Sequence, residues 1–294
     1  MANDKILEVK DLSVSFNTYA GEVKAVRGVS FELNRGETLA FVGESGCGKT
    51  VTAKSILRLL KPPFAVIKEG SQITCDGKDV LALNKKELCE FRGDEVSMIF
   101  QDPMTSLNPT MTVGKQIMES LRIHRHLSKK EAREEAIRML KMVNIPSAEK
   151  RVDSYPHEMS GGMRQRIVIA IALSCRPKIL ICDEPTTALD VTIQAQILKL
   201  IKDLQKEYNY TIVFITHDLG VVANIADRVA VLYAGQIIEF ANVEELFYDP
   251  RHPYTWALLS SLPQLAEREY KAVLDYRYPA VSVQQDYRRP VRTA

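Results

Sequence analysis

The sequence lacks any long apolar segment. The longest clean apolar run near its middle, residues 167–173, falls far short of the roughly 20 residues that a membrane-spanning helix needs. The first ten residues, MANDKILEVK, contain no apolar stretch of the kind found in a secretory signal. We therefore expect neither a membrane span nor a signal peptide, so any link to a membrane should run through a partner protein.

Cysteine and net charge are also scarce. The five cysteines form no C-x-x-C pair, and we expect reduced thiols in a cytoplasmic protein. Lys and Arg total 39 against 37 Asp and Glu, a net charge of +2, which argues against binding to nucleic acid or anionic lipid by bulk charge. The chain has 294 residues and is 46% hydrophobic, which is typical of a soluble globular protein with one large or two ordinary domains.

The hydrophobic pattern predicts two kinds of strand. Within the first 35 residues, apolar and polar residues alternate, as in antiparallel strands with one solvated face. Further along, four short runs are apolar throughout, which indicates parallel strands covered by helices on both faces. These runs are residues 38–42, 178–182, 211–215 and 229–233. The fold class that follows is α/β, with an N-terminal antiparallel β subdomain.

The middle of the chain, from about residue 101 to 160, is different. It shows no strong strand pattern, and Ser128 with Glu131 forms a capping-box pattern that predicts the start of a helix. We expect an inserted α-helical subdomain there, within a first domain over residues 1–250. Residues 251–294 are expected to form a C-terminal extension.

The most specific motif follows the first parallel strand. Residues 43–50, GESGCGKT, have the form G-x-x-x-x-G-K-[ST], in which backbone amides and a helix N-terminus bind phosphate. Lys49 would reach the β- and γ-phosphates, and the Thr50 hydroxyl would bind Mg²⁺. The alternative is a chance glycine-rich turn. The candidate nucleotide-binding residues are Gly43, Glu44, Ser45, Gly46, Cys47, Gly48, Lys49, Thr50 and Val51.

Polar side chains follow the other apolar runs. Asp183, at a strand's carboxyl end, suits Mg²⁺, and Glu184 could orient or deprotonate an attacking water. His217 ends another run and could bond a γ-phosphate. Gln101 follows a further run, and its residue type alone leaves a site role and a structural role equally open. Acids that only cap the next element, and a histidine satisfied in its loop, are the structural alternatives.

A second helix start carries a serine and two glycines. Ser160, Gly161 and Gly162 precede the apolar run 167–173, and such a helix N-terminus can bind an anion. Ordinary helix capping is the competing interpretation. A second capping signal is Asp190, which precedes a helical pattern of buried aliphatic residues.

Together these motifs resemble the ATP-binding subunits of ABC transporters, over about residues 5–260. The resemblance implies a P-loop NTPase (RecA-like) core that uses ATP and Mg²⁺. Residues 43–50 resemble the Walker A loop, Gln101 the Q-loop, Ser160 to Gln165 the signature, Ile179 to Glu184 Walker B, Asp190 the D-loop and His217 the switch histidine. The signature reads Met-Ser-Gly-Gly-Met, where Leu-Ser-Gly-Gly-Gln is commonest in the family.

The resemblance also implies roles for these residues. Two ATP-binding subunits would meet head to tail, so that the signature of one chain contacts the ATP bound by the other. An aromatic side chain would stack on adenine, and Phe16 is the candidate, with Tyr19 as a competitor. The implied catalytic residues are Glu184, His217 and Gln101, the metal ligands Thr50, Gln101 and Asp183, and the signature contacts Ser160, Gly161, Gly162 and Gln165.

Two further segments, residues 100–109 and 251–259, are similar to subunits of oligopeptide and dipeptide importers. This similarity implies peptide uptake with a second, paralogous ATP-binding subunit, two membrane-spanning permease subunits and an extracytoplasmic peptide-binding protein. The chain would then lie at the cytoplasmic face of the cell membrane, and we expect no nucleic-acid partner. Because no cysteine follows Cys182, no iron–sulfur cluster is expected. From about residue 267 the tail does not resemble the family extension.

Three alternatives remain. Nickel importers share parts of both segments, so the chain could serve a nickel or other small-solute importer. A soluble ABC ATPase acting on nucleic acid or ribosomes is disfavoured, because the sequence shows neither long coiled coils nor a second cassette. Glu184 and His217 argue against a non-hydrolysing nucleotide switch.

Overall fold

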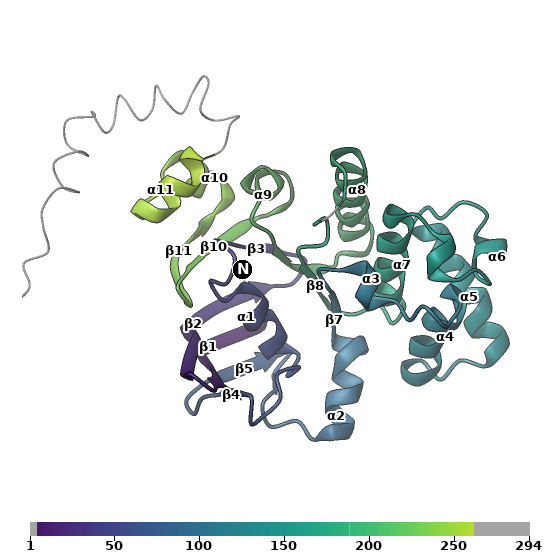
Figure 1. Cartoon of the computed structure of the whole chain (residues 1–294), viewed down its shortest axis with the longest axis horizontal. Coiled ribbons are helices and arrows are strands. Elements are labelled where there is room, and N and C mark those ends of the chain that lie inside the picture. The colour runs from purple at the N-terminus through teal and green to yellow at the C-terminus, as the bar shows by residue number, and fades with distance from the viewer. Residues whose placement is uncertain (1–4, 188, 262–294) are drawn as a thin grey trace, which may run out of the picture. The chain divides into compact units, whose positions relative to one another are not determined.

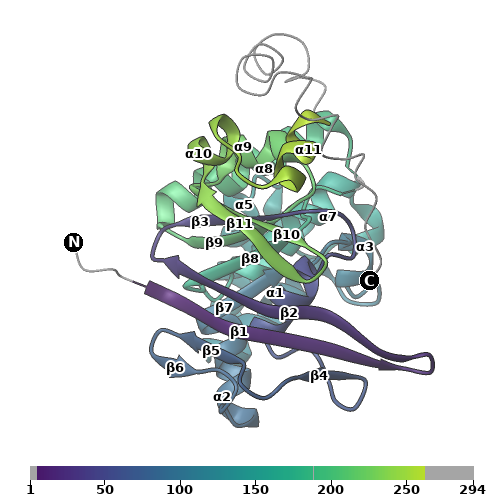
Figure 2. The same ribbon diagram turned by 90° about the vertical axis from the view of Figure 1, so that its left-hand side faces the viewer.

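The structure, a computed structural model, describes residues 5–187 and 189–261. The expected atypical tail from residue 267 lies outside these residues, as does Ala188 beside the D-loop. The chain divides into two compact units after Val243. The first unit is an α/β fold that confirms the expected class, and Figures 1 and 2 show it from two sides.

The strands form two sheets. The five-stranded sheet is antiparallel, with β1 between β2 and β5, β6 beyond β5 and β4 also paired with β1. The six-stranded sheet has the order β11-β10-β3-β9-β8-β7, and all its neighbours are parallel except β11. The strands are β1 Lys5–Thr18, β2 Gly21–Asn34, β3 Thr38–Val42, β4 Ala65–Ile67, β5 Gln72–Cys75, β6 Lys78–Asp79, β7 Val96–Ile99, β8 Ile179–Asp183, β9 Thr211–Ile215, β10 Arg228–Tyr233 and β11 Gln236–Asn242.

The two strand patterns of the sequence lead to these two sheets. The alternating segments form the hairpin of β1 and β2, and the run 38–42 forms β3, whose residues are all buried. The sequence did not predict β4, β5 and β6, which complete the antiparallel sheet. These strands are at most four residues long, so their hydrophobic periodicity is too short to detect.

Helices connect and cover the strands. The segment from residue 101 to 160 is helical, and α4, α5 and α6 lie together in Figure 1. The helices are α1 Lys49–Ile56, α2 Lys85–Glu90, α3 Pro103–Ser106, α4 Val113–His124, α5 Lys129–Met142, α6 Ala148–Arg151, α7 Gly161–Leu173, α8 Val191–Tyr208, α9 Leu219–Ile225, α10 Val243–Tyr248 and α11 Pro253–Ser260. A π-helical turn, Phe91–Glu95, precedes β7, and a 3₁₀ turn, Pro156–Glu158, precedes the Ser160 helix start.

The parallel sheet separates two hydrophobic clusters. Along β9, Ile212 and Phe214 belong to a cluster with α4, α5, α7 and α8, whereas Val213 and Ile215 face a cluster with α1 and the antiparallel sheet. Successive side chains on a strand point to opposite faces, so one short apolar strand supplies both clusters. This double burial fixes the register of the strands, and with it the position of every loop at their carboxyl ends.

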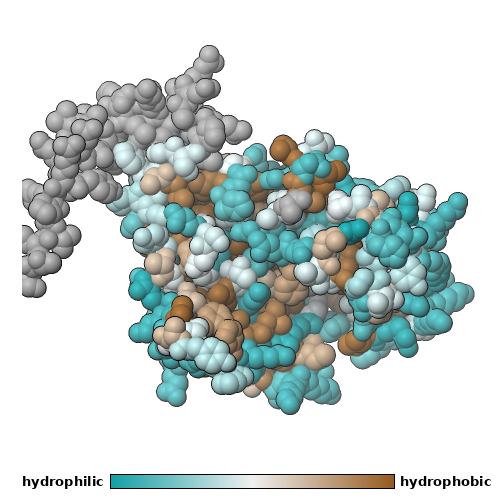
Figure 3. All heavy atoms as spheres, viewed as in Figure 1, coloured by the Kyte–Doolittle hydropathy of each residue, from teal (hydrophilic) through white to brown (hydrophobic). Residues whose placement is uncertain are grey.

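In the part of the chain that the structure describes, no helix is both long enough and apolar enough to cross a bilayer. On the face shown in Figure 3, hydrophilic side chains predominate and hydrophobic ones gather in small patches.

Two caps predicted from the sequence are present. The Ser128 hydroxyl accepts a hydrogen bond from the Glu131 amide at 3.3 Å, and the Glu131 carboxylate accepts one from the Ser128 amide at 2.9 Å. Asp190 likewise accepts a bond from the Ile193 amide at 2.9 Å at the start of α8. Each bond satisfies an amide that the first helical turn leaves unpaired.

Replacing the cap should lower stability. Ser128→Ala removes both the cap acceptor and its capping-box geometry, so we expect the free energy of unfolding to fall by about 1 kcal/mol in urea titrations. Thr112→Ala is the matched control, because Thr112 is the N-cap of α4 but makes no side-chain cap bond. Equal losses in the two variants would contradict this account of the α5 cap.

Candidate nucleotide-binding and catalytic site

Four adjacent parallel strands bring the polar motifs to one edge of the sheet. β3 leads into the phosphate loop, residues 43–50, β9 ends before His217, β8 ends at Asp183, and β7 ends before Gln101. The carboxyl ends of parallel strands lie on the same side, which is where ligands bind in open α/β sheets. Motifs more than a hundred residues apart in sequence are therefore neighbours.

The phosphate loop passes close to other backbone segments. A Cβ atom on Gly43, whose φ is 145°, would lie 2.2 Å from the Leu232 carbonyl oxygen. One on Gly48, with φ of 109°, would lie 2.8 Å from the oxygen of Ala25. Both positions thus require glycine for two reasons, left-handed backbone and lack of space. The tight path directs the loop around a central position that an anion can occupy.

Lys49 lies at the centre of this loop. Its Nζ donates hydrogen bonds to the carbonyl oxygens of Gly43 at 2.7 Å and Glu44 at 2.8 Å, and the residue is only 5% exposed. These bonds stabilise the loop and hold a buried positive charge beside exposed residues Ser45 and Gly46. Lys49 is thereby placed to exchange carbonyl partners for phosphate oxygens.

Two loop residues from the sequence prediction turn their side chains inward. Cys47 is 7% exposed, and burial raises the pKa of its thiol, although the charge of Lys49 opposes this shift. Val51 is half-buried and packs against the hydrophobic cluster that contains α1 and the antiparallel sheet. For both residues, contact with a nucleotide would come from the backbone rather than the side chain.

Thr50 and Asp183 form the candidate metal site. The Thr50 hydroxyl donates to Asp183 Oδ1 at 2.8 Å, and Asp183 is 2% exposed. Burial raises the pKa of this carboxyl, an effect that the Thr50 hydrogen bond partly opposes. A hydroxyl and a carboxylate are the hard oxygen donors that suit Mg²⁺, which takes its remaining ligands from phosphates and water. The residues therefore fit the ion.

Glu184 has three neighbours at the site. Its Oε2 accepts hydrogen bonds from Gln101 Nε2 at 2.8 Å and Thr187 Oγ1 at 3.1 Å, and its Oε1 lies 3.6 Å from His217 Nδ1. The structure therefore brings the three predicted catalytic residues into one group. The amide nitrogen of Gln101 faces Glu184, so a metal role for Gln101 would have to use its oxygen. The sequence prediction missed Thr187, three residues after Glu184.

The Ser160 tip, residues 160–162, begins α7 as predicted. Ser160 is exposed and its hydroxyl accepts a bond from the Met163 amide at 3.3 Å. A Cβ on Gly162 would lie 2.7 Å from Cγ2 of Ile193, so this glycine lets α7 approach the start of α8. Gln165 departs from the rest of the predicted signature, because it is 1% exposed and its side chain lies in the interior.

The candidate adenine-binding aromatics lie near the tip of the β1–β2 hairpin. Phe16 is half-buried and meets Phe64 edge to face, with ring centroids 5.5 Å apart. Tyr19 is fully exposed, and Phe64 is 62% exposed. Phe64 is a third candidate that the sequence did not suggest, because it is distant in sequence and adjoins Phe16 only through the pairing of β1 with β4.

Comparison with known proteins identifies the family. Residues 26–187, more than half of the chain, match the family model described as ABC transporter. The chain belongs to the ABC transporter family. Residues 238–278 match the model described as oligopeptide/dipeptide transporter, C-terminal region. The sequence was expected to leave the family pattern from about residue 267. The match continues to residue 278, so residues 267–278 still resemble this family model.

Individual relatives agree with this assignment. The chain is 61% identical over 272 residues to the oligopeptide transport ATP-binding protein OppD of Bacillus subtilis, covering 92% of this chain and 76% of the relative. It is 58% identical to the dipeptide transport ATP-binding protein DppD of the same organism, with 89% and 78% covered. A dimeric, post-hydrolysis ATP-binding cassette, MJ0796 bound to ADP and Pi, matches with a TM-score of 0.71 at 27% identity over 81% of this chain and 98% of that one.

The position of Lys49 gives a first prediction for the site. Lys49→Ala removes a charge-assisted phosphate contact, so we expect the Kd for ATP to rise at least about tenfold in calorimetric titrations. Lys61→Ala, which alters an exposed lysine just beyond α1, should leave the Kd unchanged. Equal affinity of Lys49→Ala and wild type would remove Lys49 from the binding site.

The raised pKa of Asp183 gives a second prediction, which concerns stability. Because the folded state holds the Asp183 proton more tightly than the unfolded chain, the ionised carboxylate lowers stability at pH values above the ordinary Asp pKa of about 3.9. Asp183→Asn should therefore raise the Tm of the nucleotide-free protein at neutral pH. The gain should shrink as the pH falls through the raised pKa of the folded state and vanish below about 3.9, where the carboxyl is protonated in both states. A gain that does not vary with pH would contradict the burial effect.

Proposed function

We propose that this protein is the ATP-hydrolysing subunit of an importer for oligopeptides or dipeptides. The observation that carries the proposal is the contact of Glu184 with Gln101 and His217 at the same sheet edge as the phosphate loop. A phosphate-binding loop alone indicates nucleotide binding, whereas an adjacent carboxylate with polar neighbours supplies a base for hydrolysis.

The residues at the sheet edge have separate roles in hydrolysis. The phosphate loop would bind the triphosphate through its amides and Lys49, and Thr50 and Asp183 would hold Mg²⁺. When bound, the metal neutralises phosphate charge. Glu184 accepts a proton from the attacking water, and Gln101 and His217 orient the carboxylate and contact the γ-phosphate region. The stacked adenine would rest on Phe16, Tyr19 or Phe64.

The Ser160 tip completes the site of a second ATP-binding subunit. Ser160 and Gly161 are exposed at the N-terminus of a 13-residue helix, where amides and the helix dipole favour an anion. ATP that contacts both chains only in the closed dimer shifts the open–closed equilibrium towards closure, and hydrolysis reverses the shift. The dimeric cassette that resembles this chain supports such pairing. We infer that the second subunit is a paralogue.

Peptide import requires membrane partners, because the described part of this chain has no membrane-spanning helix. The relatives named for oligopeptide and dipeptide transport support a complex with two permease subunits and an extracytoplasmic peptide-binding protein. The chain would act at the cytoplasmic face of the cell membrane. In this arrangement ATP binding in one subunit moves a substrate that another subunit selects.

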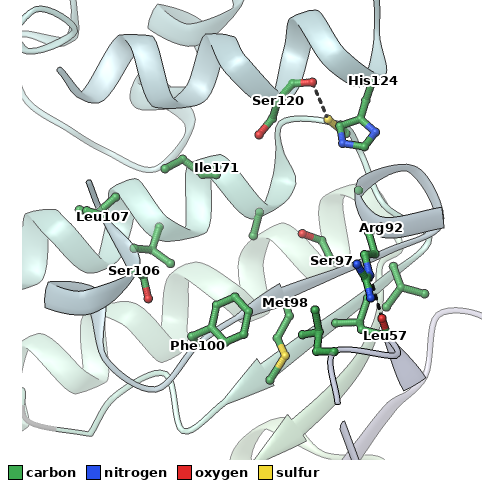
Figure 4. A pocket seen from close by; sticks show the side chains of 16 residues that line it. Leu57, Arg92, Ser97, Met98, Phe100, Ser106, Leu107, Ser120, His124 and Ile171 are labelled. Carbon is green, nitrogen blue, oxygen red and sulfur yellow. Dashed lines mark hydrogen bonds between the residues drawn. The ribbon is translucent and has the colours of Figure 1, made fainter. Parts of the chain in front are cut away.

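A pocket beside Gln101 is the proposed contact surface for the permease subunits. It has a volume of about 270 Å³ and lies between β7, α4 and α7. Figure 4 shows Phe100, Ser106 and Leu107 on one side of it and Ser120 and His124 on the other. Because the segment that follows Gln101 forms one wall, a partner bound in this pocket would be positioned to sense the catalytic edge.

Substitution of the base tests the hydrolytic role. Glu184→Gln keeps the shape of the side chain but removes its proton-accepting charge, so ATP affinity should persist while turnover falls about a hundredfold or more. Steady-state ATPase assays on the assembled, peptide-stimulated complex would measure this. Glu134→Gln, an exposed change on α5, is the control and should behave as wild type. Normal turnover with Glu184→Gln would contradict the proposed function.

A further inference from the structure

Of the three neighbours of the Glu184 carboxylate, Thr187 is the nearest in sequence, three residues further along the chain. The backbone turns at Glu184, whose φ of 46° is unusual for a residue with a side chain, and the Thr187 amide donates to the Glu184 carbonyl at 3.2 Å. This turn places the Thr187 hydroxyl 3.1 Å from Glu184 Oε2. One turn therefore holds both the backbone and the carboxylate of Glu184.

The other two neighbours of the carboxylate are less constrained. Gln101 lies on an exposed loop after β7, and the His217 side chain is 64% exposed after β9. Each reaches Glu184 from a separate strand, so each contact changes when its own loop moves. Thr187 is half-buried, and its branched side chain has few rotamers. Among these three neighbours, Thr187 offers the most rigid support.

Described residues near this turn make further contacts. Asp190 caps α8 through the Ile193 amide, and Ile193 packs on Gly162 of the Ser160 tip. The amide of Glu184 donates to the Ile215 carbonyl at 3.0 Å on the neighbouring strand. The turn from Glu184 to Thr187 is thus anchored to β9 at its Glu184 end, and its own hydrogen bonds give the Thr187 hydroxyl a defined position.

We propose that Thr187 is a positioning residue for ATP hydrolysis: its hydroxyl holds Oε2 of Glu184 so that Oε1 faces the reacting water. This proposal rests on the role of Glu184 as the base. Thr187 does not contact nucleotide in this mechanism. It acts by restricting the carboxylate to one orientation, and misplacement of a catalytic group by about 1 Å can cost up to about a hundredfold in rate.

Substitutions at Thr187 in the complete transporter complex test the proposal. Thr187→Val keeps the shape of the side chain but removes the hydroxyl, and we expect kcat to fall about tenfold while KM for ATP changes by less than about twofold. Thr187→Ser restores the hydroxyl and should return kcat to near the wild-type value. Thr187→Ala provides a second hydroxyl deletion if the valine variant does not assemble.

A double-mutant cycle separates this proposal from the function on which it rests. In single-turnover assays, Thr187→Val combined with Glu184→Gln should be no slower than Glu184→Gln alone, because the hydroxyl acts only through the carboxylate. A further tenfold loss in the double variant, or an unchanged kcat in Thr187→Val and Thr187→Ala, would overturn the positioning role. Normal turnover in Glu184→Gln alone would instead overturn the assignment of the base.

Discussion

The site depends on the parallel alignment of β3, β9, β8 and β7. Each strand is short and buried on both faces, so its register is set by two hydrophobic clusters at once. That register places Lys49, Asp183, Glu184, His217 and Gln101 at one edge, although Gln101 and Glu184 are 83 positions apart. A one-residue slip of β8 would exchange the buried faces of the strand and remove Asp183 from its bond with Thr50.

The phosphate loop, both helix caps and the parallel strands could be predicted because each depends on a few consecutive residues. Gly43 and Gly48 are required by local backbone geometry, and Ser128 and Asp190 cap the helices that directly follow them. The same reasoning does not reach features that tertiary packing decides. Gln165 belongs to the signature by sequence but points into the interior. Strands β4 and β5 are defined only by their pairing with β1, β6 only by its pairing with β5, and Phe64 meets Phe16 only through the β1–β4 pair.

One short segment links the proposed base to the Ser160 tip. Glu184 and Thr187 form its first turn, and Ile193 at its other end meets Gly162 so closely that no side chain would fit on that glycine. The base would serve the nucleotide of its own chain, and the tip would serve the nucleotide of the partner. The base and the contact that positions the tip therefore lie close together in the sequence, at Glu184 and Ile193.

In the proposed dimer, the sheet edge of this chain would bind one ATP while its Ser160 tip closes on the ATP of the partner. A structure of the complete transporter bound to a non-hydrolysable ATP analogue tests it most directly. We expect Lys49 Nζ within hydrogen-bonding distance of the phosphates in its own chain, and Ser160 beside the terminal phosphate held by the partner. A closed, fully loaded assembly in which Ser160 lies remote from every terminal phosphate would contradict the account.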